Sequence, residues 1–326
     1  MSRFTKRTII VAAVAGLVAS LAAVGGAPAA SGQGTDEAVP VVAAAAASAG
    51  VESSGPLTSP AFAGNGPTER SGVAPEATVI SDGTFDGRPV NGESVIGPDD
   101  GRVQVTDTTQ YPASAIGQIE LVDFDGGEFI CTGWLIDSNS ILTSGHCAFT
   151  PAPTGDHIIQ AAQFFPGRNG GSDPFGGCNV TSAFSRRGWR VNGLAKDDWA
   201  VMGLDCAIGN RVGRLGYFSV PAVNGLDGKT ARVEGYPGDK PFGTHWKMSG
   251  TIAARTDANN VYYPMDTFGG QSGSPIMVAN RPACGGPCGM GIHSYGADGV
   301  PPLNSGPRIT TRNFNIITTQ RQLNGD

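Results

Sequence analysis

The stretch Leu142-Thr143-Ser144-Gly145-His146-Cys147 ends a short apolar strand with small residues, one histidine and one cysteine. Upstream, Cys131-Thr132-Gly133-Trp134 provides a second cysteine, and a bridge from Cys131 to Cys147 would join the two strands that lead to His146. An isolated histidine is usually a core or surface residue. This combination of strand, small residues, histidine and bridged cysteine instead favours a catalytic role for His146.

A second stretch, Gly269-Gly270-Gln271-Ser272-Gly273-Ser274-Pro275, surrounds a candidate nucleophile, Ser272, with residues that allow a tight turn. Such a turn can direct the amide groups of Gly270 and Ser272 toward one point, as an oxyanion hole requires. An ordinary glycine-rich β-turn is the alternative. The stretch is not the nucleophile motif of the α/β-hydrolases, because position 274 is serine rather than glycine.

A candidate acid, Asp198, directly precedes the apolar run Trp199-Ala200-Val201-Met202, which is typical of a buried strand. A carboxylate at this place can accept the Nδ1 proton of a neighbouring imidazole. Asp197 is the competing candidate, and we prefer Asp198 because it stands directly before the aromatic residue. The chain order His146, Asp198, Ser272 matches that of chymotrypsin and differs from the orders of subtilisin and the α/β-hydrolases.

Short apolar or alternating runs recur along the chain from Ser94 onward, separated by Gly, Pro, Asn and Asp, and their spacing predicts an all-β barrel or sandwich. The predicted strands cover residues 116–122, 129–136, 140–144, 157–165, 199–204, 230–234, 244–254, 261–265, 274–279 and 290–294. The tail, from about Asn313 to Leu323, predicts an amphipathic helix packed on a barrel.

The N-terminal third of the chain predicts two segments that do not belong to the folded domain. Residues 1–29 have a basic start, an uncharged apolar run and small residues ending at Ala29, the order of a secretory signal peptide. Residues 30–93 are rich in Ala, Gly, Pro and Ser, lack cysteine and hold two aromatic side chains, so we expect a largely disordered prosegment. Residues 94–326 would then form the secreted domain, with no membrane attachment after signal cleavage.

Six cysteines in an exported chain suggest three disulfides rather than a metal site. A zinc site would need a second cluster of ligands beside the CGGPC stretch at 284–288, so we expect no metal and no other cofactor. Other connectivities stay open from the sequence alone. The predicted pairs are Cys131 with Cys147, Cys178 with Cys206, and Cys284 with Cys288.

Several longer stretches are spread over the segment from Ser94 onward. They are SVIG at 94–97, TDTT at 106–109, CTGW at 131–134, GHC at 145–147, PGRNG at 166–170, GYPGDK at 235–240, DTFGGQSGSP at 266–275 and GIH at 291–293. Together they make this segment resemble the glutamyl endopeptidases, a bacterial branch of the trypsin-like family. The resemblance implies two antiparallel six-stranded β-barrels, at about 108–208 and 215–310, followed by the C-terminal helix.

The same resemblance implies a serine endopeptidase that works through an acyl-enzyme and cleaves after glutamate, less well after aspartate. Thr267, His293 and the new chain end at Ser94 and Val95 would hold the substrate carboxylate. Hydroxyl, imidazole and ammonium groups supply the donors and the positive charge that such a pocket needs.

Two other functions stay open. Asp266 stands where trypsin carries the aspartate of its pocket, so cleavage after arginine or lysine is one alternative. A binding protein of the same fold without activity is the other, although no candidate catalytic residue is missing. The segment from Ser94 onward holds 17 lysines and arginines against 20 aspartates and glutamates, which offers no basic surface for nucleic acid. We expect polypeptide substrates and a monomer.

Overall fold

The computed structural model describes residues 39–40, 60–67, 88–89, 95–152, 155–298 and 301–325. The predicted signal peptide, most of the predicted prosegment and Ser94 lie outside these residues. Among the described residues, no helix is both long enough and apolar enough to cross a membrane.

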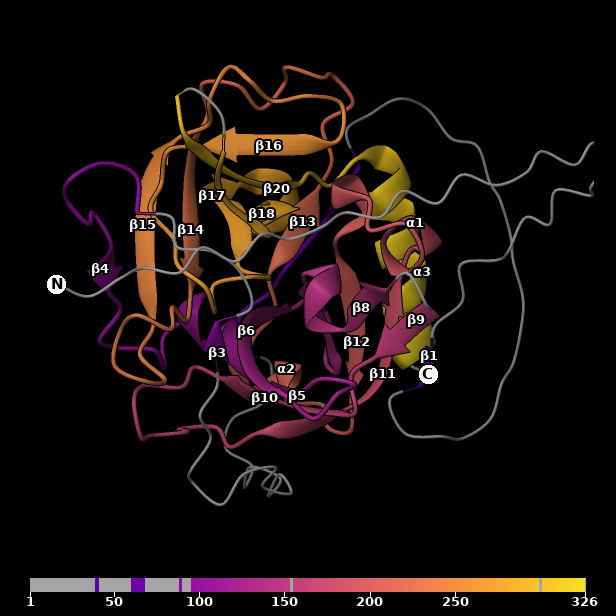
Figure 1. Ribbon diagram of the computed structural model, residues 1–326. Helices are drawn as coiled ribbons and strands as arrows, with labels where there is room; N and C mark the ends of the chain where they lie inside the picture. Colours follow the sequence, from indigo (N-terminus) through magenta and orange to yellow (C-terminus); the bar gives the residue numbers. More distant parts are fainter. Residues whose placement is uncertain are drawn as a thin grey trace, which may run out of the picture. The chain divides into compact units, whose positions relative to one another are not determined.

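Six antiparallel strands close the first barrel, in the lower half of Figure 1. The ring runs from β5 through β6, β7, β12, β11 and β10, which pairs with β5 again. Its strands are β5 (Ile116–Val122), β6 (Glu128–Leu135), β7 (Ser140–Thr143), β10 (Ala161–Pro166), β11 (Cys178–Ser185) and β12 (Ala200–Leu204). Ile119, Ile141 and Phe164 share one face of these strands and are fully buried, which closes the ring on an apolar core.

The second half forms two sheets that meet at one antiparallel bridge, between Gly291 and Arg308. The larger sheet has the order β2, β13, β18, β17, β14, β15, β4, with β13 and β18 parallel. Its strands are β2 (Ala61–Phe62), β13 (Gly216–Phe218), β18 (Gly286–Ile292), β17 (Pro275–Arg281), β14 (Thr230–Gly235), β15 (Trp246–Thr251) and β4 (Val103–Gln104). The smaller sheet contains β16 (Asn260–Tyr263), β20 (Leu303–Pro307) and β19 (Tyr295–Asp298).

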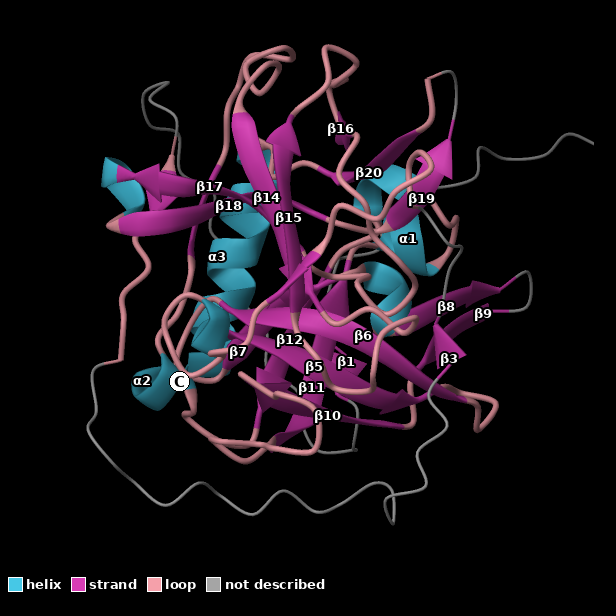
Figure 2. Ribbon diagram, turned by 90° about the vertical axis from the view of Figure 1, so that its left-hand side faces the viewer, coloured by secondary structure: helices cyan, strands magenta, loops and turns pink. Residues whose placement is uncertain are grey.

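The C-terminal helix α3 (Thr311–Gly325) packs against β7 and β12 of the first barrel (Figure 2). It also reaches β13 through a hydrogen bond of 2.8 Å between Thr318 and Tyr217. The predicted helix is therefore confirmed. Its expected apolar stripe is wrong, because Asn313 and Gln320 are buried beside Ile317. Asn313 is satisfied there by donating to the carbonyl of Arg308, at 3.2 Å.

Nine of the predicted strands each overlap one observed strand, and the all-β prediction is confirmed. The run 157–165 divides, because β9 (Gly155–Ile158) pairs with β8 (Phe149–Ala152) in a separate hairpin and β10 starts afresh at Ala161. The sequence analysis missed β11, whose small and polar residues give no apolar run. That strand instead carries its buried residues in an irregular pattern between β10 and β12.

Three disulfides join the cysteines in the predicted pairs, Cys131–Cys147, Cys178–Cys206 and Cys284–Cys288. The first connects β6 to η2 (Gly145–Cys147), the single 3-10 turn that carries His146, with 6.2 Å between the two Cα atoms. It therefore fixes the strand end on which the candidate base sits.

Replacing both Cys131 and Cys147 by alanine should lower the free energy of unfolding by about 2 to 4 kcal/mol, because the bridge restricts the unfolded chain. Peptidase activity should fall with it, since Cys147 adjoins His146. Urea unfolding and rate measurements check both. The pair Cys284→Ala and Cys288→Ala is the control. It closes a separation of 4 rather than 16 residues, so an equal loss of stability and activity there would contradict the assignment.

Candidate active site

His146 and Asp198 meet through two hydrogen bonds. The backbone N–H of His146 donates to Oδ1 of Asp198 at 2.8 Å, and Nδ1 of the ring lies 2.9 Å from Oδ2. Asp198 is fully buried between η3 (Ala195–Asp197) and β12. A carboxylate so placed requires the proton on Nδ1 and leaves Nε2 as the basic nitrogen. That Nε2 is buried and has no hydrogen-bond partner among the described residues.

Gly145 makes this approach possible. A Cβ at position 145 would lie 2.7 Å from the ring of Trp189 and 3.0 Å from the carboxylate of Asp198. Trp189 itself lies edge-on to His146, with 6.2 Å between the ring centroids, and donates its indole N–H to the carbonyl of Phe149. The small residue before the histidine is thus required by packing.

Asp197, the competing candidate acid, points elsewhere. Its carboxylate pairs with the guanidinium of Arg186, and it is buried. Asp198 is the neighbour that contacts His146, in agreement with the preference for the residue directly before Trp199.

Ser272 lies in a turn that runs from the loop after β16 into β17. Gln271 donates its N–H to the carbonyl of Phe268 at 3.0 Å, and Ser274 donates to Gln271 at 2.9 Å. The sulfur of Cys147, the residue after His146, lies 3.8 Å from the carbonyl oxygen of Ser272. The disulfide therefore places the backbone of Ser272 next to the residue that follows the candidate base.

The two glycines around Ser272 adopt left-handed backbone conformations, with φ of 98° at Gly270 and 92° at Gly273. A Cβ on Gly270 would lie 2.6 Å from the carbonyl of Tyr236, and one on Gly273 would lie 2.0 Å from the carbonyl of Thr132. Within the described part of the chain, the N–H groups of Gly270 and Ser272 donate to no protein acceptor. Two free backbone N–H groups in one tight turn are what an oxyanion hole requires.

Thr132 on β6 holds this turn, a role that the sequence analysis missed. Its N–H donates to the carbonyl of Ser272 at 2.8 Å. Its hydroxyl donates to the carbonyl of Gly270 at 2.9 Å and accepts the N–H of Tyr236 at 3.0 Å. Thr132 stood in the CTGW stretch as a neighbour of Cys131, and no local pattern indicated a contact 140 residues away.

Two serines link the histidine loop to the end of β18. The hydroxyl of Ser144 donates to the carbonyl of His293 at 2.8 Å and lies 2.8 Å from the hydroxyl of Ser294. Ser294 in turn lies 3.1 Å from the carbonyl of Asp198. Both serines are buried, so they position the loops of His146 and Asp198 relative to His293.

His293 is buried, and its Nδ1 lies 2.5 Å from the hydroxyl of Tyr263. Burial lowers the pKa of His293 to about 3, with the charge of His146 acting in the same direction and a hydrogen bond to the Ser305 backbone opposing it. Burial raises the pKa of Tyr263 well above its usual range. Tyr263 therefore keeps its proton and donates a hydrogen bond to Nδ1 of the neutral imidazole. Burial therefore disfavours the charged form of His293 in the free protein.

Thr267 and Asp266 differ in whether their side-chain oxygens have hydrogen-bond partners. The hydroxyl of Thr267 is buried and has no hydrogen-bond partner among the described residues. Asp266 is buried too, but both of its carboxylate oxygens are occupied, because Ile96 and Gly101 each donate a backbone N–H at 2.7 Å. Asp266 thus anchors the chain that follows Val95.

Arg102 provides a second attachment for the segment that follows Val95. Its buried guanidinium pairs with Asp100 and Asp239, and Nη1 lies 3.4 Å from Oε1 of Gln271. Burial acts to lower the pKa of Arg102, but the hydrogen bonds to the two carboxylates outweigh it and raise the pKa. The segment 95–102 is therefore bound at two points that adjoin Thr267 and Ser272.

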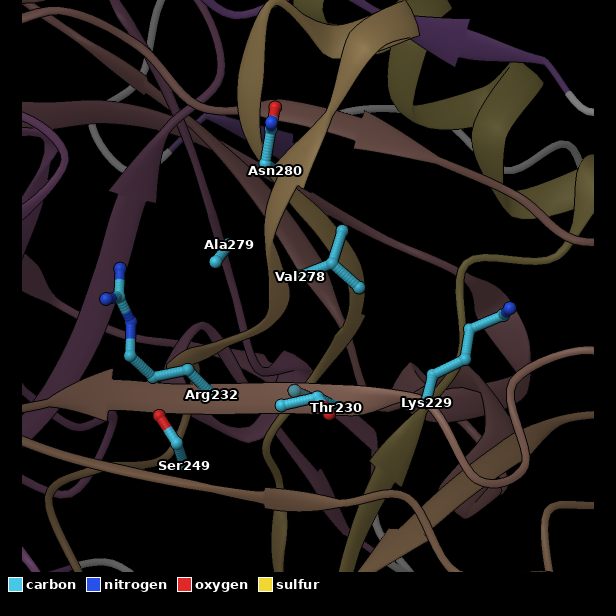
Figure 3. Close-up of a pocket in the computed structure, with 8 residues that line it drawn as sticks. Lys229, Thr230, Arg232, Ser249, Val278, Ala279 and Asn280 are labelled. Carbon is cyan, nitrogen blue, oxygen red and sulfur yellow. The ribbon is translucent and has the colours of Figure 1, made fainter.

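A pocket of about 370 Å³ lies away from these residues, on strands β14, β15 and β17 (Figure 3). Arg232, Ser249 and Asn280 are among the side chains that line it. None of the candidate catalytic or substrate-binding residues contributes to it.

Two clusters of potential metal ligands occur in the described residues, and the chemistry of their sulfurs opposes a metal at either. One contains Cys131, His146 and Cys147, and the other contains Cys178, Asp205 and Cys206. In each cluster the two cysteines are joined in a disulfide, so neither offers a thiolate.

Removing the hydroxyl of Thr132 by Thr132→Val should lower the free energy of unfolding by about 1 to 3 kcal/mol, because a buried N–H and a buried carbonyl lose their partner. It should also lower kcat more than it raises KM, since Gly270 is part of the turn that would bind the oxyanion. Urea unfolding and steady-state rates check this. Thr132→Ser keeps the hydroxyl and should restore both quantities; failure of that rescue would reject the role.

Comparison with known proteins agrees with this geometry. A model of the trypsin family matches residues 106–317. A glutamyl endopeptidase of Bacillus licheniformis is 40% identical over 232 residues, which cover 71% of this chain and 70% of that protein. A Bacillus subtilis protein named extracellular metalloprotease is 32% identical over 225 residues, covering 69% and 68%.

Among solved structures, a Glu endopeptidase in complex with MPD superposes with a TM-score of 0.60 and 34% identity, covering 70% of this chain and 99% of that one. The closed antiparallel barrel, the contact between His146 and Asp198 and the serine turn thus occur in a chain that matches one family over most of its folded part. The chain belongs to the trypsin family and is a serine endopeptidase.

Proposed function

We propose that this protein is a secreted endopeptidase that cleaves polypeptides after glutamate, with His146, Asp198 and Ser272 as its catalytic triad. The observation that carries the triad is the double hydrogen bond from His146 to the buried Asp198. The relatives named glutamyl endopeptidase support the choice of glutamate.

The mechanism follows from the atoms at hand. Ser272 Oγ attacks the carbonyl carbon of the scissile bond while Nε2 of His146 takes its proton, and Asp198 stabilises the imidazolium that forms. The N–H groups of Gly270 and Ser272 stabilise the negative oxygen of the tetrahedral intermediate. His146 then gives the proton to the leaving amine, and an acyl-enzyme on Ser272 remains. Water, activated by the same imidazole, releases the second product.

Glutamate specificity would come from hydrogen-bond donors on the buried residues Thr267 and His293. Thr267 has a buried hydroxyl without a partner among the described residues. His293 accepts a hydrogen bond from Tyr263 at Nδ1, so the proton of its neutral ring is on Nε2. That N–H has the Ser305 backbone as its partner in the free protein, and a substrate carboxylate would share or replace this hydrogen bond. We assign these two groups to the substrate carboxylate, whose charge would in turn favour protonation of His293 when it binds.

Cleavage after arginine or lysine gains no support from the contacts of Asp266. A pocket aspartate must present a free carboxylate to the substrate cation. Both oxygens of Asp266 accept backbone N–H groups of the segment after Val95. Its role is to bind that segment.

Maturation would connect the chain end to the pocket. We infer cleavage of a signal peptide near Ala29 and of the prosegment at Glu93-Ser94, a bond that follows a glutamate. The new terminus would lie two residues before Ile96, whose N–H binds Asp266, the neighbour of Thr267. A neutral amide there would become an ammonium group that stabilises the substrate carboxylate, which explains how a precursor stays weakly active. We expect the mature domain to act as a monomer.

The replacement Ser272→Ala should lower kcat by several orders of magnitude without loss of folding, because the covalent route is lost while the oxyanion donors remain. His146→Ala should cost nearly as much, and the two losses should not add. Peptidase rates and labelling by a fluorophosphonate test this. Ser274→Ala, two residues away, is the control and should keep most of the activity; labelling that persists in Ser272→Ala would reject the assignment.

Profiling with a peptide library should give glutamate first at the P1 position, then aspartate, which is one methylene shorter, and arginine and lysine last. His293→Ala should lower kcat/KM for P1 glutamate by about tenfold to a hundredfold, the usual effect of losing a hydrogen bond to a charged group. The loss for P1 glutamine should be smaller. His157→Ala is the matched control, because His157 stacks on Phe124 in the hairpin of β8 and β9, outside the site. Preferred cleavage after arginine would favour the trypsin-like alternative.

Amino-terminal sequencing of the secreted protein should find Ser94, or Val95 if one further residue is removed. Glu93→Gln should slow the release of the prosegment, because the enzyme that we propose requires a carboxylate at that position. Mass spectrometry of the secreted products measures both. A terminus far from residues 94–95 in the wild type would reject self-processing at this bond.

A further inference from the structure

A short segment far upstream of the catalytic domain lies on the second half of the fold. Within Pro60–Pro67, β2 pairs antiparallel with β13, with Phe62 opposite Tyr217 and Ala61 opposite Phe218. Because β13 has β18 on its other side, β2 occupies what would otherwise be an open sheet edge.

Backbone hydrogen bonds continue beyond the strand at both ends. Ser219 donates its N–H to the carbonyl of Pro60 at 3.0 Å. Asn65 and Arg214 exchange two bonds, at 3.0 and 2.8 Å. Gly64 donates to the carbonyl of Cys284 at 2.9 Å, beside the third disulfide. The contact is thus a register-specific strand addition along most of the segment.

One aromatic side chain ties the segment to the C-terminal helix. The ring of Phe62 stacks on Tyr217 with 5.2 Å between centroids. The guanidinium of Arg321, on α3, lies 3.9 Å from the centre of the Phe62 ring. Tyr217 also contacts Phe314 and Thr318 of the same helix. Phe62 therefore packs at the junction between β13 and α3.

The two backbones approach so closely that only glycine fits. A Cβ on Gly64 would lie 2.3 Å from the N atom of Gly216 and 2.5 Å from the carbonyl of Arg214. A Cβ on Gly216 would lie 2.6 Å from the carbonyl of Phe62. By contrast, a Cβ on Gly66 would meet nothing within 4 Å. Close fit at matched positions of both partners distinguishes a built contact from a chance one.

We propose that Pro60–Pro67 is a docking segment, through which the region ahead of the catalytic domain binds the edge of β13 and holds that strand to helix α3. Composition alone predicted disorder for this region. The docked residues contact none of the triad residues, so the segment stabilises the second half of the fold and does not block the active site. Cleavage at Glu93 would cut the chain outside the contact and leave its hydrogen bonds intact. The docking itself does not depend on the proposed specificity.

Hydrogen exchange on the full chain carrying Ser272→Ala, which cannot process itself, tests the proposal. The amides of Ser219 and Arg214 donate to the segment and should be protected. Gly64→Val should increase their exchange rates by about tenfold or more, because the added side chain cannot be accommodated and the edge opens locally. The amides of the first barrel, such as that of Ile119, should keep their rates.

Gly66→Ala is the matched control and should leave the exchange of Ser219 and Arg214 unchanged. If Gly64→Val does not yield folded protein, Phe62→Ala keeps the backbone contacts, removes the ring at α3, and should raise the same two rates and lower Tm. Equal protection of Ser219 and Arg214 in the parent chain and in Gly64→Val or Phe62→Ala would overturn the proposal. Fast exchange of both amides in the parent chain would do the same.

Discussion

The active site depends on the hydrogen bonds by which Thr132 holds the turn around Ser272. Thr132 belongs to a strand of the first barrel, and the turn belongs to the second half, so these bonds fix one part of the fold against the other. The neighbouring residue, Cys131, is bonded to Cys147, which follows His146. One short piece of β6 therefore sets the position of both the proposed base and the proposed nucleophile.

The same constraint explains why glycine is needed where it occurs. The carbonyl of Thr132 approaches Gly273 so closely that a side chain at position 273 would collide with it. Gly273 and Gly270 adopt left-handed conformations, which glycine takes without a steric penalty. The chain can therefore pass this close to β6. The hydrogen bonds to Thr132 hold this turn in place, so its free donors keep their position in the absence of substrate.

Much of this could be predicted from the sequence, because its strongest signals are local. A bridged cysteine follows His146, glycines surround Ser272, and a buried strand follows Asp198. Each of these patterns can be recognised within a few residues of the sequence. The contacts of Thr132 and Ser294 could not be predicted, since they join residues more than 90 positions apart and depend on how two halves pack. Likewise, β11 could not be predicted, because its sequence contains no apolar run. Its pairing with β10 and β12 determines its structure more than its own composition does.

The state of His293 shows where residue type misleads. A histidine near an anion site suggests positive charge, but burial in the second half lowers its pKa to about 3, and the same holds for His245. Both groups are neutral in the folded protein and titrate near 6.5 when unfolded, so the unfolded chain binds more protons as the pH falls below 6.5. The fold therefore loses stability between about pH 6.5 and 3 on account of these two residues. An incoming carboxylate would offset that cost at His293 alone, because we assign His293 and not His245 to the substrate.

Two of the attachments made by the N-terminal part of the described chain have different consequences; β1 (Val39–Pro40) on β11 and β3 (Arg88–Pro89) on β6 are others. Asp266 and Arg102 bind residues 95–102 beside Thr267 and Gln271. A new charge at the start of this segment would therefore act on the proposed substrate pocket. Pro60–Pro67 attaches at β13 and α3, where none of the triad residues is in contact. A cut between the two attachments would alter the charge beside the pocket and leave the sheet edge covered. Activation and stability would then be controlled by separate parts of one precursor, because the two contacts share no residue.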